Sequence, residues 1–552
     1  MAYRPVEQDQ PTFLPPALGD LIPENDLCRV VDAFVDSLSR AVVEDKFRRH
    51  VGNLPHHPRV MLKIILYAYT QRLYSCRKIA AATTRDVHFM WLAGGNHPSF
   101  NTVNRFRGDY LREILPAAFA ALAQLLLEKR IIRTQDYFVD GTILDADANK
   151  NSHVWRKNVA RFKQRVQERA AEILAEADAV NVAEDALYGA ADLPEKTAGA
   201  HLSAAEIREA AQKLSASDDA RQQKSGASLT KEAVKLERYE AQEKTLGTRN
   251  SYSKTDPDAT FMRTKDDLLR PAYNPMPGVQ DGFITGVSVG QNPNDAVGFI
   301  AHMEARDALG LPPPPTVTGD SIFGTEENYA YLEQKQIGNY LKYPSWLREQ
   351  RGQLKPYEKA AFVYDEVRDV FTCPQGKTLA FVEEKQTTTE SGYAKAVRVY
   401  ECGACADCPV KSDCTSSAGG RRVQDSAELN RYRCQARENL SSAAGVQLRK
   451  RRSSEVETVF GHLKRNGGFR RFSLRGLPKV RLEFTWQALG YNLTRLVGRL
   501  KTLGMGWNPF GRAGKPFEQG ENPLNGGKNP FHRGGNPLDR VQKAGLGRFL
   551  TA

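Results

Sequence analysis

Three acidic residues lie where the sequence could place a metal-binding carboxylate on a rigid element. Asp140 ends the apolar run YFVD and Asp320 ends TVTGD, so each stands at the end of a predicted buried strand. A carboxylate there is costly to desolvate unless a cation or a hydrogen-bond donor lies beside it. Glu457 lies in a predicted helix, and Lys464, seven residues further on, is two turns away on the same face. Such carboxylates suit two Mg²⁺ ions about 3.5–4 Å apart, which clamp the attacking and leaving oxygens of a phosphoryl transfer.

Asp140 and Asp320, each taken alone, also fit a simpler interpretation, in which a strand-end aspartate caps the following turn. The segment around Glu457 favours the metal site instead. Between Arg449 and Lys501 there are fourteen Lys or Arg against three Glu, which gives +11 of the chain's net charge of +13. This density of cations favours the binding of a scissile phosphate over an ordinary solvated basic face. The candidate phosphate-binding residues are Arg452, Lys464, Arg465, Arg470, Arg471 and Arg475.

Three nearby carboxylates compete with this set. Asp145 and Asp147 follow Asp140 beyond the predicted strand and turn. Glu455 lies two residues before Glu457 and therefore about 200° round the helix, so only one of the two glutamates can face a common site. Glu457 is the preferred residue, and the other three carboxylates remain alternatives.

Five of the eight cysteines fall between Cys373 and Cys414. Eight cysteines in 552 residues are too few for a fold built on disulfides. The Cys-x₂-Cys spacing within ECGACADC matches tetrahedral coordination of Zn²⁺ by thiolates, although five thiols are one more than a four-cysteine site needs. A structural zinc site is the preferred interpretation, and unligated thiols are the alternative. A catalytic cysteine is disfavoured because no His occurs from residue 303 to 461.

The apolar patterns predict the elements that must position these residues. Residues 27–127 predict a series of short helices, and YFVDGTILDA predicts a strand followed by a turn. Residues 155–247 are rich in Ala, Glu, Lys, Arg and Gln and predict a helical hairpin or coiled coil, with a capping box at Ser203. Strand patterns at 282–290 and 315–320, with a helical pattern between them, indicate an α/β core.

Composition excludes several other classes of protein. With 41% hydrophobic and 26% charged residues, the chain as a whole is not intrinsically disordered. The net charge of +13 and the pI near 9.2 favour an acidic partner, of which nucleic acid is the commonest. No apolar run reaches the ~20 residues of a membrane span, and the N-terminus lacks the pattern of a secretory signal. We therefore expect a protein without a membrane partner that stays in the compartment where it is made.

Several motifs occur in a characteristic order along the chain. They are HHPRVMLKIILYAY, SCRKI, YFVDGT, DPDATFMR, VTGDSIFGTEEN, VETVFGHLKRNGGFRRFSLRG and YNL. Together they resemble the DDE transposases of bacterial insertion sequences, over about residues 40–150 and 250–500. The resemblance implies an RNase-H-like mixed α/β core whose catalytic triad is a first-strand Asp, a fourth-strand Asp and a helical Glu, here Asp140, Asp320 and Glu457. It also implies that this triad holds two Mg²⁺ (or Mn²⁺) ions and that Lys464, in the Glu-x₆-Lys pattern, touches substrate DNA.

The family pattern also implies a set of zinc ligands and a division of the chain. It assigns structural Zn²⁺ to Cys373, Cys405, Cys408 and Cys414, with Cys402 as a possible further ligand. The predicted segments are an extended N-terminal segment (1–26), a helical DNA-binding domain (27–130), the first part of the catalytic core (131–154 and 248–350), a helical hairpin insertion (155–247), a cysteine-rich zinc-binding insertion (351–445), the C-terminal part of the core with the Glu-bearing helix (446–504) and a disordered Asn-Pro- and Gly-rich tail (505–552).

Two positions depart from related families, which often have Tyr and Arg seven and four residues before the catalytic Glu. Here these positions are Lys450 and Ser453, and Arg452 is the nearest substitute. The implied function is metal-dependent cleavage at insertion-sequence ends and strand transfer into target DNA, by a homodimer bound to double-stranded DNA in the nucleoid of a bacterial cytoplasm. The alternatives are a catalytically inactive zinc-containing DNA-binding protein, for example a domesticated relative, and an RNase-H-like nuclease without strand transfer.

Overall fold

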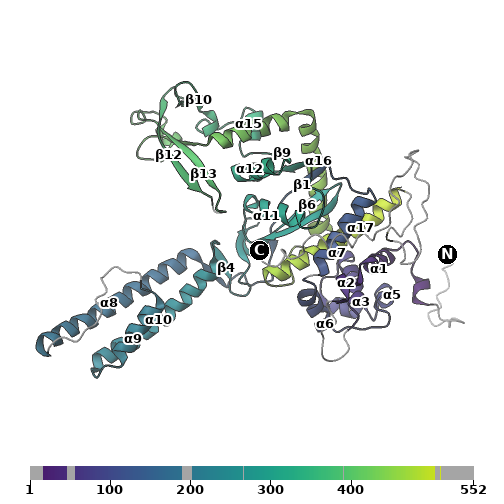
Figure 1. Cartoon of the computed structure of the whole chain (residues 1–552), viewed down its shortest axis with the longest axis horizontal. Coiled ribbons are helices and arrows are strands. Elements are labelled where there is room, and N and C mark those ends of the chain that lie inside the picture. The colour runs from purple at the N-terminus through teal and green to yellow at the C-terminus, as the bar shows by residue number, and fades with distance from the viewer. Residues whose placement is uncertain are drawn as a thin grey trace, which may run out of the picture. The chain divides into compact units, whose positions relative to one another are not determined.

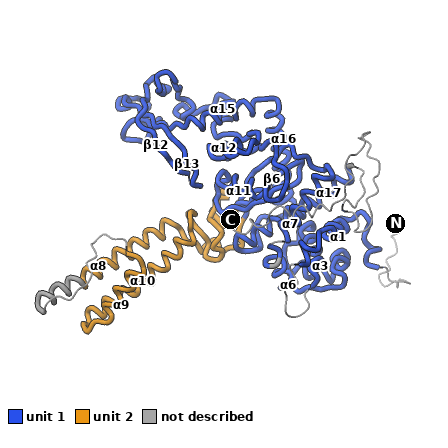
Figure 2. The backbone as a smooth tube through the Cα atoms, viewed as in Figure 1, with its two compact units in different colours: residues 1–144, 274–552 blue, residues 145–273 orange. Residues whose placement is uncertain are grey.

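The structure is a computed structural model that describes residues 17–45, 56–112, 114–188, 202–264, 266–389, 391–503 and 510. Two compact units are present: unit 1 contains residues 1–144 and 274–552, and unit 2 contains residues 145–273 (Figure 2). The predicted tail, apart from Phe510, and the first sixteen residues of the predicted extended segment lie outside the described residues. The chain is a mixed α/β protein with a helical N-terminal region and a mixed sheet, which confirms the predicted fold class at this level.

Short helices form the N-terminal part of unit 1, as the apolar pattern predicts. Asp26, Asp86 and Ser99 accept hydrogen bonds from backbone N–H groups in the first turns of α1, α5 and α6. Ser75 occupies the corresponding position before α4, but its side chain makes no cap hydrogen bond. The elements are η1 (Leu18–Leu21), α1 (Leu27–Ser37), α2 (Arg40–Val43), α3 (Pro58–Thr70), α4 (Cys76–Ala82), α5 (Val87–Ala93), α6 (Phe100–Arg105), the π-helical turn η3 (Phe106–Tyr110) and α7 (Ile114–Glu128).

The long helix α17 (Leu477–Leu503) packs against both these helices and the sheet. Trp486 stacks on Tyr69 of α3, with 5.7 Å between ring centroids. Asn492 is buried and bonds both backbone groups of Ile284 in β7, accepting from its N–H at 2.9 Å and donating to its carbonyl at 2.7 Å. These two hydrogen bonds to one residue fix the position of α17 along the sheet.

A mixed sheet forms the centre of unit 1 (Figure 1). Strands β1, β8 and β9 run parallel to one another, whereas β6 is antiparallel to β1, and β7 is antiparallel to β6. The order across the sheet is β7-β6-β1-β8-β9, and the short β2 also pairs with β6. The bounds are β1 (Asp136–Val139), β2 (Leu144–Asp145), β6 (Leu269–Gln280), β7 (Phe283–Gly290), β8 (Thr316–Gly319) and β9 (Gly338–Leu341).

Helices cover both faces of this sheet. Because neighbouring residues of a strand point to opposite faces, successive residues of β1 contact different helices. Tyr137 and Val139 belong to a buried cluster with residues of α11 (Asp295–Asp307), α12 (Glu326–Gln334) and α15 (Ala427–Ser441). Phe138 lies on the other face, where the guanidinium of Arg451 on α16 (Ala443–Phe460) lies 5.2 Å from its ring centroid. The carboxyl end of β1 is therefore flanked by α11 on one face and by α16 on the other.

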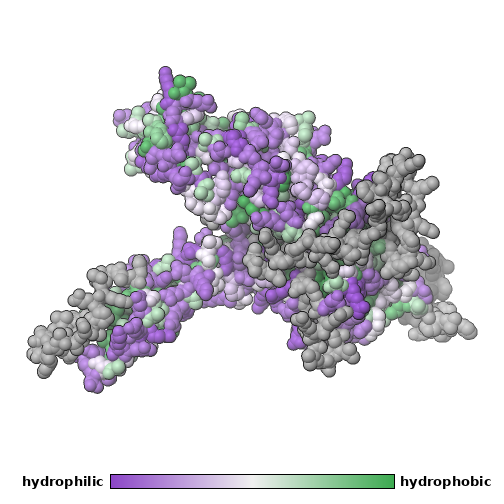
Figure 3. Space-filling model, in the orientation of Figure 1, coloured by the Kyte–Doolittle hydropathy of each residue, from purple (hydrophilic) through white to green (hydrophobic). Residues whose placement is uncertain are grey.

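The cysteine-rich part of unit 1 is an antiparallel sheet of five strands in the order β10-β11-β12-β13-β14. Its core contains Phe371, Tyr400 and two of the cysteines. Figure 3 shows apolar surface over its β10–β12 end, where Val363 and Val367 are exposed. The elements of this part and its flanks are η4 (Ser321–Phe323), α13 (Trp346–Gln350), η5 (Lys359–Ala361), β10 (Val363–Asp365), β11 (Val370–Thr372), β12 (Thr378–Thr388), β13 (Ala394–Glu401), α14 (Lys411–Cys414) and β14 (Arg422–Asp425).

Unit 2 consists of long helices on a small strand base. Ser203 and Glu206 form the expected capping box at the start of α9, and Gly247, at a φ of 53°, ends α10. Apolar side chains of the three helices form one buried cluster. The elements are β3 (His153–Trp155), α8 (Arg156–Tyr188), α9 (Ala204–Ser215), α10 (Ala220–Leu246), β4 (Ser251–Ser253) and β5 (Thr260–Arg263).

Within the described ranges, no single helix is long and apolar enough to cross a membrane. One bent pair, residues 100–109 with 114–128, reaches the required length and apolarity only when its two helices are taken together.

Candidate active site

The register of the three parallel strands places charged residues side by side at their carboxyl ends. Phe138 pairs with Thr318, so two positions further on Asp140 falls beside Asp320. Gly319 pairs with Leu341, so the next position of β9 places Lys342 beside Asp320. Residues opposite one another in a sheet point to the same face. The sheet therefore presents two carboxylates and an ammonium at one edge.

Asp140 is largely buried and forms an ion pair with Arg452 of α16. The two side chains are 23% and 12% exposed, and 2.8 Å separates Asp140 Oδ2 from Arg452 Nη2. The N–H of Gly141 donates to Asp140 Oδ1 at 3.0 Å. Burial, together with the nearby carboxylates Asp295 and Asp320, raises the pKa of Asp140 to about 6 against the lowering effect of Arg452. Arg452 and the Gly141 N–H thus favour the charged form of Asp140 and oppose the effect of burial.

Asp320 is more open, with 49% of its side chain exposed. Lys342 Nζ lies 3.6 Å from its Oδ1. Although burial opposes it, the backbone N–H of Ser321 and the cations Arg452 and Lys342 hold the pKa of Asp320 below its ordinary value. The two aspartates therefore differ: one is buried and hard to ionise, and the other is open and readily ionised.

Glu457 lies on α16 with its side chain exposed. The helix from Glu457 to Lys464 is not the continuous α-helix that the sequence predicted, because α16 ends at Phe460 and η6 (Gly461–Asn466) is π-helical. Lys464 lies on this π-helical turn and donates from Nζ to the carbonyl of Ile143 at 2.9 Å. The segment that carries Glu457 and Lys464 thus reaches the loop after Asp140.

The structure brings Asp140 and Asp320 together but does not complete a metal site with Glu457. Within the described ranges, no three His, Cys, Asp or Glu side chains are arranged so that they could hold a metal ion. The donor types nevertheless suit Mg²⁺, which takes carboxylate oxygens and keeps several waters. A bound cation at Asp140 would have to share this carboxylate with Arg452 or displace it.

The competing carboxylates have other partners. Glu455 accepts a hydrogen bond from the N–H of Gly282 and lies 3.6 Å from Arg451, and burial raises its pKa. Asp145 belongs to unit 2, where its Oδ2 lies 3.1 Å from Arg270. Asp147 also lies in unit 2. Glu455 therefore binds the β6–β7 turn rather than the strand end of Asp140.

The predicted phosphate-binding residues divide into two groups. Arg452 and Lys464 are partly buried and contact the protein at Asp140 and Ile143. The exposed group follows Lys464 along the chain and comprises Arg465, Arg470, Arg471 and Arg475.

Two residues of the site were missed in the sequence. Lys342 follows the strand β9, and the sequence signal that could have found it is the apolar–polar alternation of GNYLKY. Asp295 is the first residue of α11, after the cap residue Asn294, and its carboxylate lies against Gly141. The dipeptide Asn-Asp before a predicted helix was its only sequence signal.

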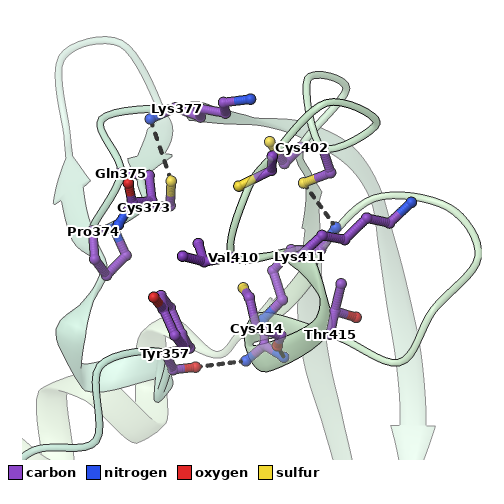
Figure 4. Close-up of a pocket in the computed structure, with 13 residues that line it drawn as sticks. Tyr357, Cys373, Pro374, Gln375, Lys377, Cys402, Val410, Lys411, Cys414 and Thr415 are labelled. Carbon is purple, nitrogen blue, oxygen red and sulfur yellow. Dashed lines mark hydrogen bonds between the residues drawn. The ribbon is translucent and has the colours of Figure 1, made fainter.

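The five clustered cysteines line one small cavity of about 20 Å³, and Figure 4 shows Cys373, Cys402 and Cys414 around it. Two thiols accept backbone N–H groups: Cys373 Sγ from Lys377 at 3.3 Å and Cys405 Sγ from Arg421 at 3.4 Å. Burial and a contact with Cys405 raise the pKa of Cys402 to about 11. The cavity has room for about one water-sized sphere. Cys402 and Cys405 also belong to the apolar core of this sheet.

Two family models of transposases match parts of the chain. A transposase DDE domain model matches residues 372–497, and a transposase domain (DUF772) model matches residues 16–109. The two matches indicate a transposase. They further support a DDE transposase of the insertion-sequence type, which confirms the resemblance seen in the sequence. The DDE match contains Glu457 and the cysteine cluster, whereas Asp140 and Asp320 lie outside it.

That class sets the general chemistry. DDE transposases generally use divalent metal ions, and a transposase binds DNA and is expected to cleave nucleic acid. No curated protein matches the chain.

Proposed function

We propose that the chain cleaves DNA at the ends of an insertion sequence and joins them to target DNA, with Asp140, Asp320 and Glu457 as the catalytic triad. The observation that carries the proposal is the register that sets Asp140 beside Asp320 at the ends of β1 and β8. The short strands β2 and β5 also pair with β6; without them the sheet reads β1, β6, β7, β8 and β9 in chain order, and these two are its first and fourth strands. This agrees with the RNase-H-like core that the resemblance implies.

The three carboxylates would hold two Mg²⁺ or Mn²⁺ ions. When bound, the ions would supply an activated water and neutralise charge on the scissile phosphate. Asp320 is suited to this task because it is exposed and ionised, and Asp140 because it is fixed by the Gly141 N–H. Arg452 keeps Asp140 charged in the absence of a cation. Glu457 would approach the metal ions from the exposed side of α16.

The reaction consists of two transfers at phosphorus. Water first attacks the phosphodiester at the element end, so one P–O bond forms and the bond to the 3′-oxygen breaks, which releases a 3′-hydroxyl. That hydroxyl then attacks a phosphodiester of the target, and the target's own 3′-oxygen leaves with a proton. The second step exchanges one phosphodiester for another and therefore needs no external energy source. Lys464 and the exposed Arg465, Arg470, Arg471 and Arg475 would hold backbone phosphates during both steps.

The N-terminal helices are proposed to bind the element ends. Arg77 and Lys78 on α4 and Arg105 on α6 are exposed, and Arg77 lies over the ring of the exposed Phe100 at 5.2 Å. Asn101 of α6 is also exposed. Exposed cations and amides on short adjacent helices suit phosphate contacts and base-edge contacts in double-stranded DNA. The resemblance adds that two chains act together on the DNA.

The cysteine sheet is proposed to hold one structural Zn²⁺ through Cys373, Cys405, Cys408 and Cys414, with Cys402 as a possible ligand. Support comes from the donor set, because all five thiols line one cavity and two accept N–H groups that would stabilise thiolates. In the described arrangement the thiols are not yet in metal-binding geometry. Zinc would draw the thiols together and tie the strand turns of this sheet.

The proposal is tested with purified protein and a supercoiled plasmid that carries the DNA flanking its own reading frame. Cleavage at the element ends that needs Mg²⁺, gives joined products with a second plasmid and disappears in Asp320→Ala is the expected result. Cleavage that survives Asp320→Ala would overturn the assignment. DNA binding without cleavage would favour the inactive DNA-binding protein, and cleavage without joining would favour the nuclease.

A further inference from the structure

A loop after the π-helical turn carries three of the proposed phosphate-binding arginines. Residues 467–476, here called the arginine loop, join η6 to α17 and contain the exposed Arg470, Arg471 and Arg475. Long cationic side chains on a loop lose conformational freedom when they bind an anion, and this loss weakens binding unless the backbone beneath them is already fixed. The contacts of the arginine loop therefore decide how well it can hold DNA.

A buried carboxylate of α17 holds the middle of this loop. Glu483 is 0% exposed, and its Oε2 accepts the N–H groups of Ser473 and Leu474, each at 2.9 Å. The Ser473 hydroxyl donates to Glu483 Oε1. Hydrogen bonds to an ionised acceptor are stronger than those between neutral groups. Glu483 thus fixes the backbone between Arg471 and Arg475.

The counter-charge of Glu483 comes from the N-terminal helical region. Arg107 of η3 is 2% exposed, and its Nη1 lies 4.0 Å from Glu483 Oε1. The same Nη1 donates to the Tyr69 hydroxyl at 3.2 Å and to the Tyr74 carbonyl at 2.7 Å. A buried carboxylate is costly without a nearby cation, so Arg107 stabilises the contact between Glu483 and the arginine loop.

The N-terminal helical region also contacts the chain at the two ends of the arginine loop. The Tyr74 hydroxyl donates to the Gly467 carbonyl at 2.9 Å, and the Tyr74 ring meets Phe469 edge to face, with 5.4 Å between centroids. Beyond the other end, Asp109 of η3 forms an ion pair with Lys479 of α17 at 2.7 Å. The start of the loop, its middle and the residues that follow it are thus each tied to the region that carries the exposed cations of α4 and α6.

We propose that Glu483 is a positioning residue for DNA binding: it holds the arginine loop in its phosphate-binding conformation before DNA arrives, with Arg107 as its counter-ion. The loop arginines and the exposed cations of the N-terminal helices then act as one preorganised surface for the backbone of double-stranded DNA. The proposal rests on the proposed function, because that function assigns the phosphate contacts to these arginines. The alternative is that Glu483 only stabilises the fold.

The charge of Glu483 separates the two interpretations. A carboxylate near arginines repels phosphate, so its removal by itself strengthens DNA binding. Glu483→Gln keeps the size of the side chain but replaces one acceptor oxygen with an NH₂ donor, which cannot accept the loop N–H groups. If Glu483 positions the loop, this variant should bind DNA more weakly although it gains positive charge.

The test measures how the full-length chain binds a duplex taken from the DNA that flanks its own reading frame, by fluorescence anisotropy in chelator over a range of KCl concentrations. Glu483→Gln should weaken binding about tenfold or more, and the slope of log K against log salt should become shallower by about 1–3, since each lost phosphate contact removes about 0.9. The triple variant Arg470→Gln, Arg471→Gln, Arg475→Gln should show a similar loss, and adding Glu483→Gln to it should weaken binding no further. Glu438→Gln, at an exposed position of α15, makes the same change of charge and should bind as the unmodified chain does.

Thermal unfolding checks that each variant is folded. Unchanged or tighter binding in a folded Glu483→Gln chain, or a loss that adds to that of the triple variant, would overturn the proposal. Unchanged binding in the triple variant would instead remove the phosphate contacts of these arginines from the proposed function itself.

A second measurement needs no variant and decides the matter even where Glu483→Gln does not fold. Amide hydrogen exchange of the unmodified chain, read by mass spectrometry, should show Ser473 and Leu474 protected before DNA is added, with little further protection in the DNA complex. Rapid exchange of both amides without DNA, followed by protection on binding, would show that DNA itself orders the loop and would overturn the proposal.

Discussion

Asp140 and Arg452 form an ion pair across the interface between β1 and α16, with 2.8 Å between Oδ2 and Nη2. The aspartate lies at the end of a strand, and the arginine lies five residues before Glu457 on the helix that covers that strand. Because Asp140 is largely buried, its charge depends on this guanidinium. The pair thus supplies, within the protein, the positive charge that a divalent ion would supply in catalysis.

Arg452 and a bound metal ion should therefore compete for Asp140. In Arg452→Gln the aspartates lose a cation. The free energy of unfolding in the presence of a chelator should therefore fall by about 1–3 kcal/mol, which lowers the thermal unfolding midpoint. Added Mn²⁺ should then stabilise the variant more than the unmodified chain, because the ion takes the place of the guanidinium. Differential scanning fluorimetry with a Mn²⁺ titration measures both effects.

The control for this prediction is Arg465→Gln, which removes an exposed cation from the same segment. It should change neither the midpoint nor the response to Mn²⁺. Equal Mn²⁺ responses in Arg452→Gln and Arg465→Gln would show that Arg452 and the metal do not share Asp140.

The two glutamates of α16 should separate into a catalytic and a structural residue. Glu457→Gln should reduce DNA cleavage at least about a hundredfold with little change in stability, because its side chain is exposed. Glu455→Gln should lower the unfolding midpoint and leave cleavage largely intact, because Glu455 accepts the Gly282 N–H and contacts Arg451. Cleavage rates at a fixed Mg²⁺ concentration, measured together with melting curves, distinguish the two. The opposite pattern would move the catalytic role to Glu455.

Much of the site could be predicted because its residues are tied to local patterns. The apolar runs before Asp140 and Asp320 predict strands that end at a carboxylate, and the structure has β1 and β8 there. The separation of the two aspartates, 180 positions, is also the register offset between the strands, for instance from Phe138 to Thr318. The capping box at Ser203 fixed the start of α9 correctly, since a cap depends only on neighbouring residues.

The remainder depends on contacts between distant segments, which no local pattern encodes. The Asp140–Arg452 pair joins residues 312 positions apart, and the contact of Asp295 with Gly141 depends on how α11 lies on the sheet. The π-helical turn after Phe460 was missed as well, because the apolar spacing of Phe460 and Leu463 is that of an α-helix. Tertiary packing decides the first two features.

A buried histidine supports the strand that leads to Asp140. His302 of α11 is 0% exposed, and hydrogen bonds join it to Tyr137 at 2.6 Å and to Ser288 at 2.9 Å. Burial, assisted by Arg306, lowers the pKa of His302 to about 3. Below a pH of about 6.5 the unfolded chain therefore takes up a proton on this residue that the folded chain does not.

Stability should consequently fall on acidification through this one residue. The contribution of His302 to the free energy of unfolding is fully present above a pH of about 6.5. It decreases by up to about 1.4 kcal/mol for each pH unit from there towards 3. His302→Gln should lower the unfolding midpoint at neutral pH, because it disrupts the hydrogen bonds to Tyr137 and Ser288. It should also flatten the dependence of the midpoint on pH between about 5 and 6.5, the range in which an ordinary histidine titrates. Melting curves across that window, with the exposed His97→Gln as control, measure the difference in slope. Parallel pH profiles for the unmodified chain and His302→Gln would contradict the assignment.

The last prediction concerns the metal content of the cysteine cavity rather than activity. If Cys373, Cys405, Cys408 and Cys414 hold zinc, the purified chain should contain about one zinc ion, measured by elemental analysis, and a strong chelator should lower its unfolding midpoint. Cys405→Ser should lose the metal, because this thiol lies in the core of the sheet and accepts the Arg421 N–H. Cys434→Ser, at an exposed position on α15, is the matched control and should retain it.

Cys402→Ser decides whether the fifth thiol is a ligand: retained zinc makes Cys402 an apolar core residue, and lost zinc makes it a ligand. A chain that is free of zinc and indifferent to chelator in all four forms would leave the five thiols as packing residues of this sheet.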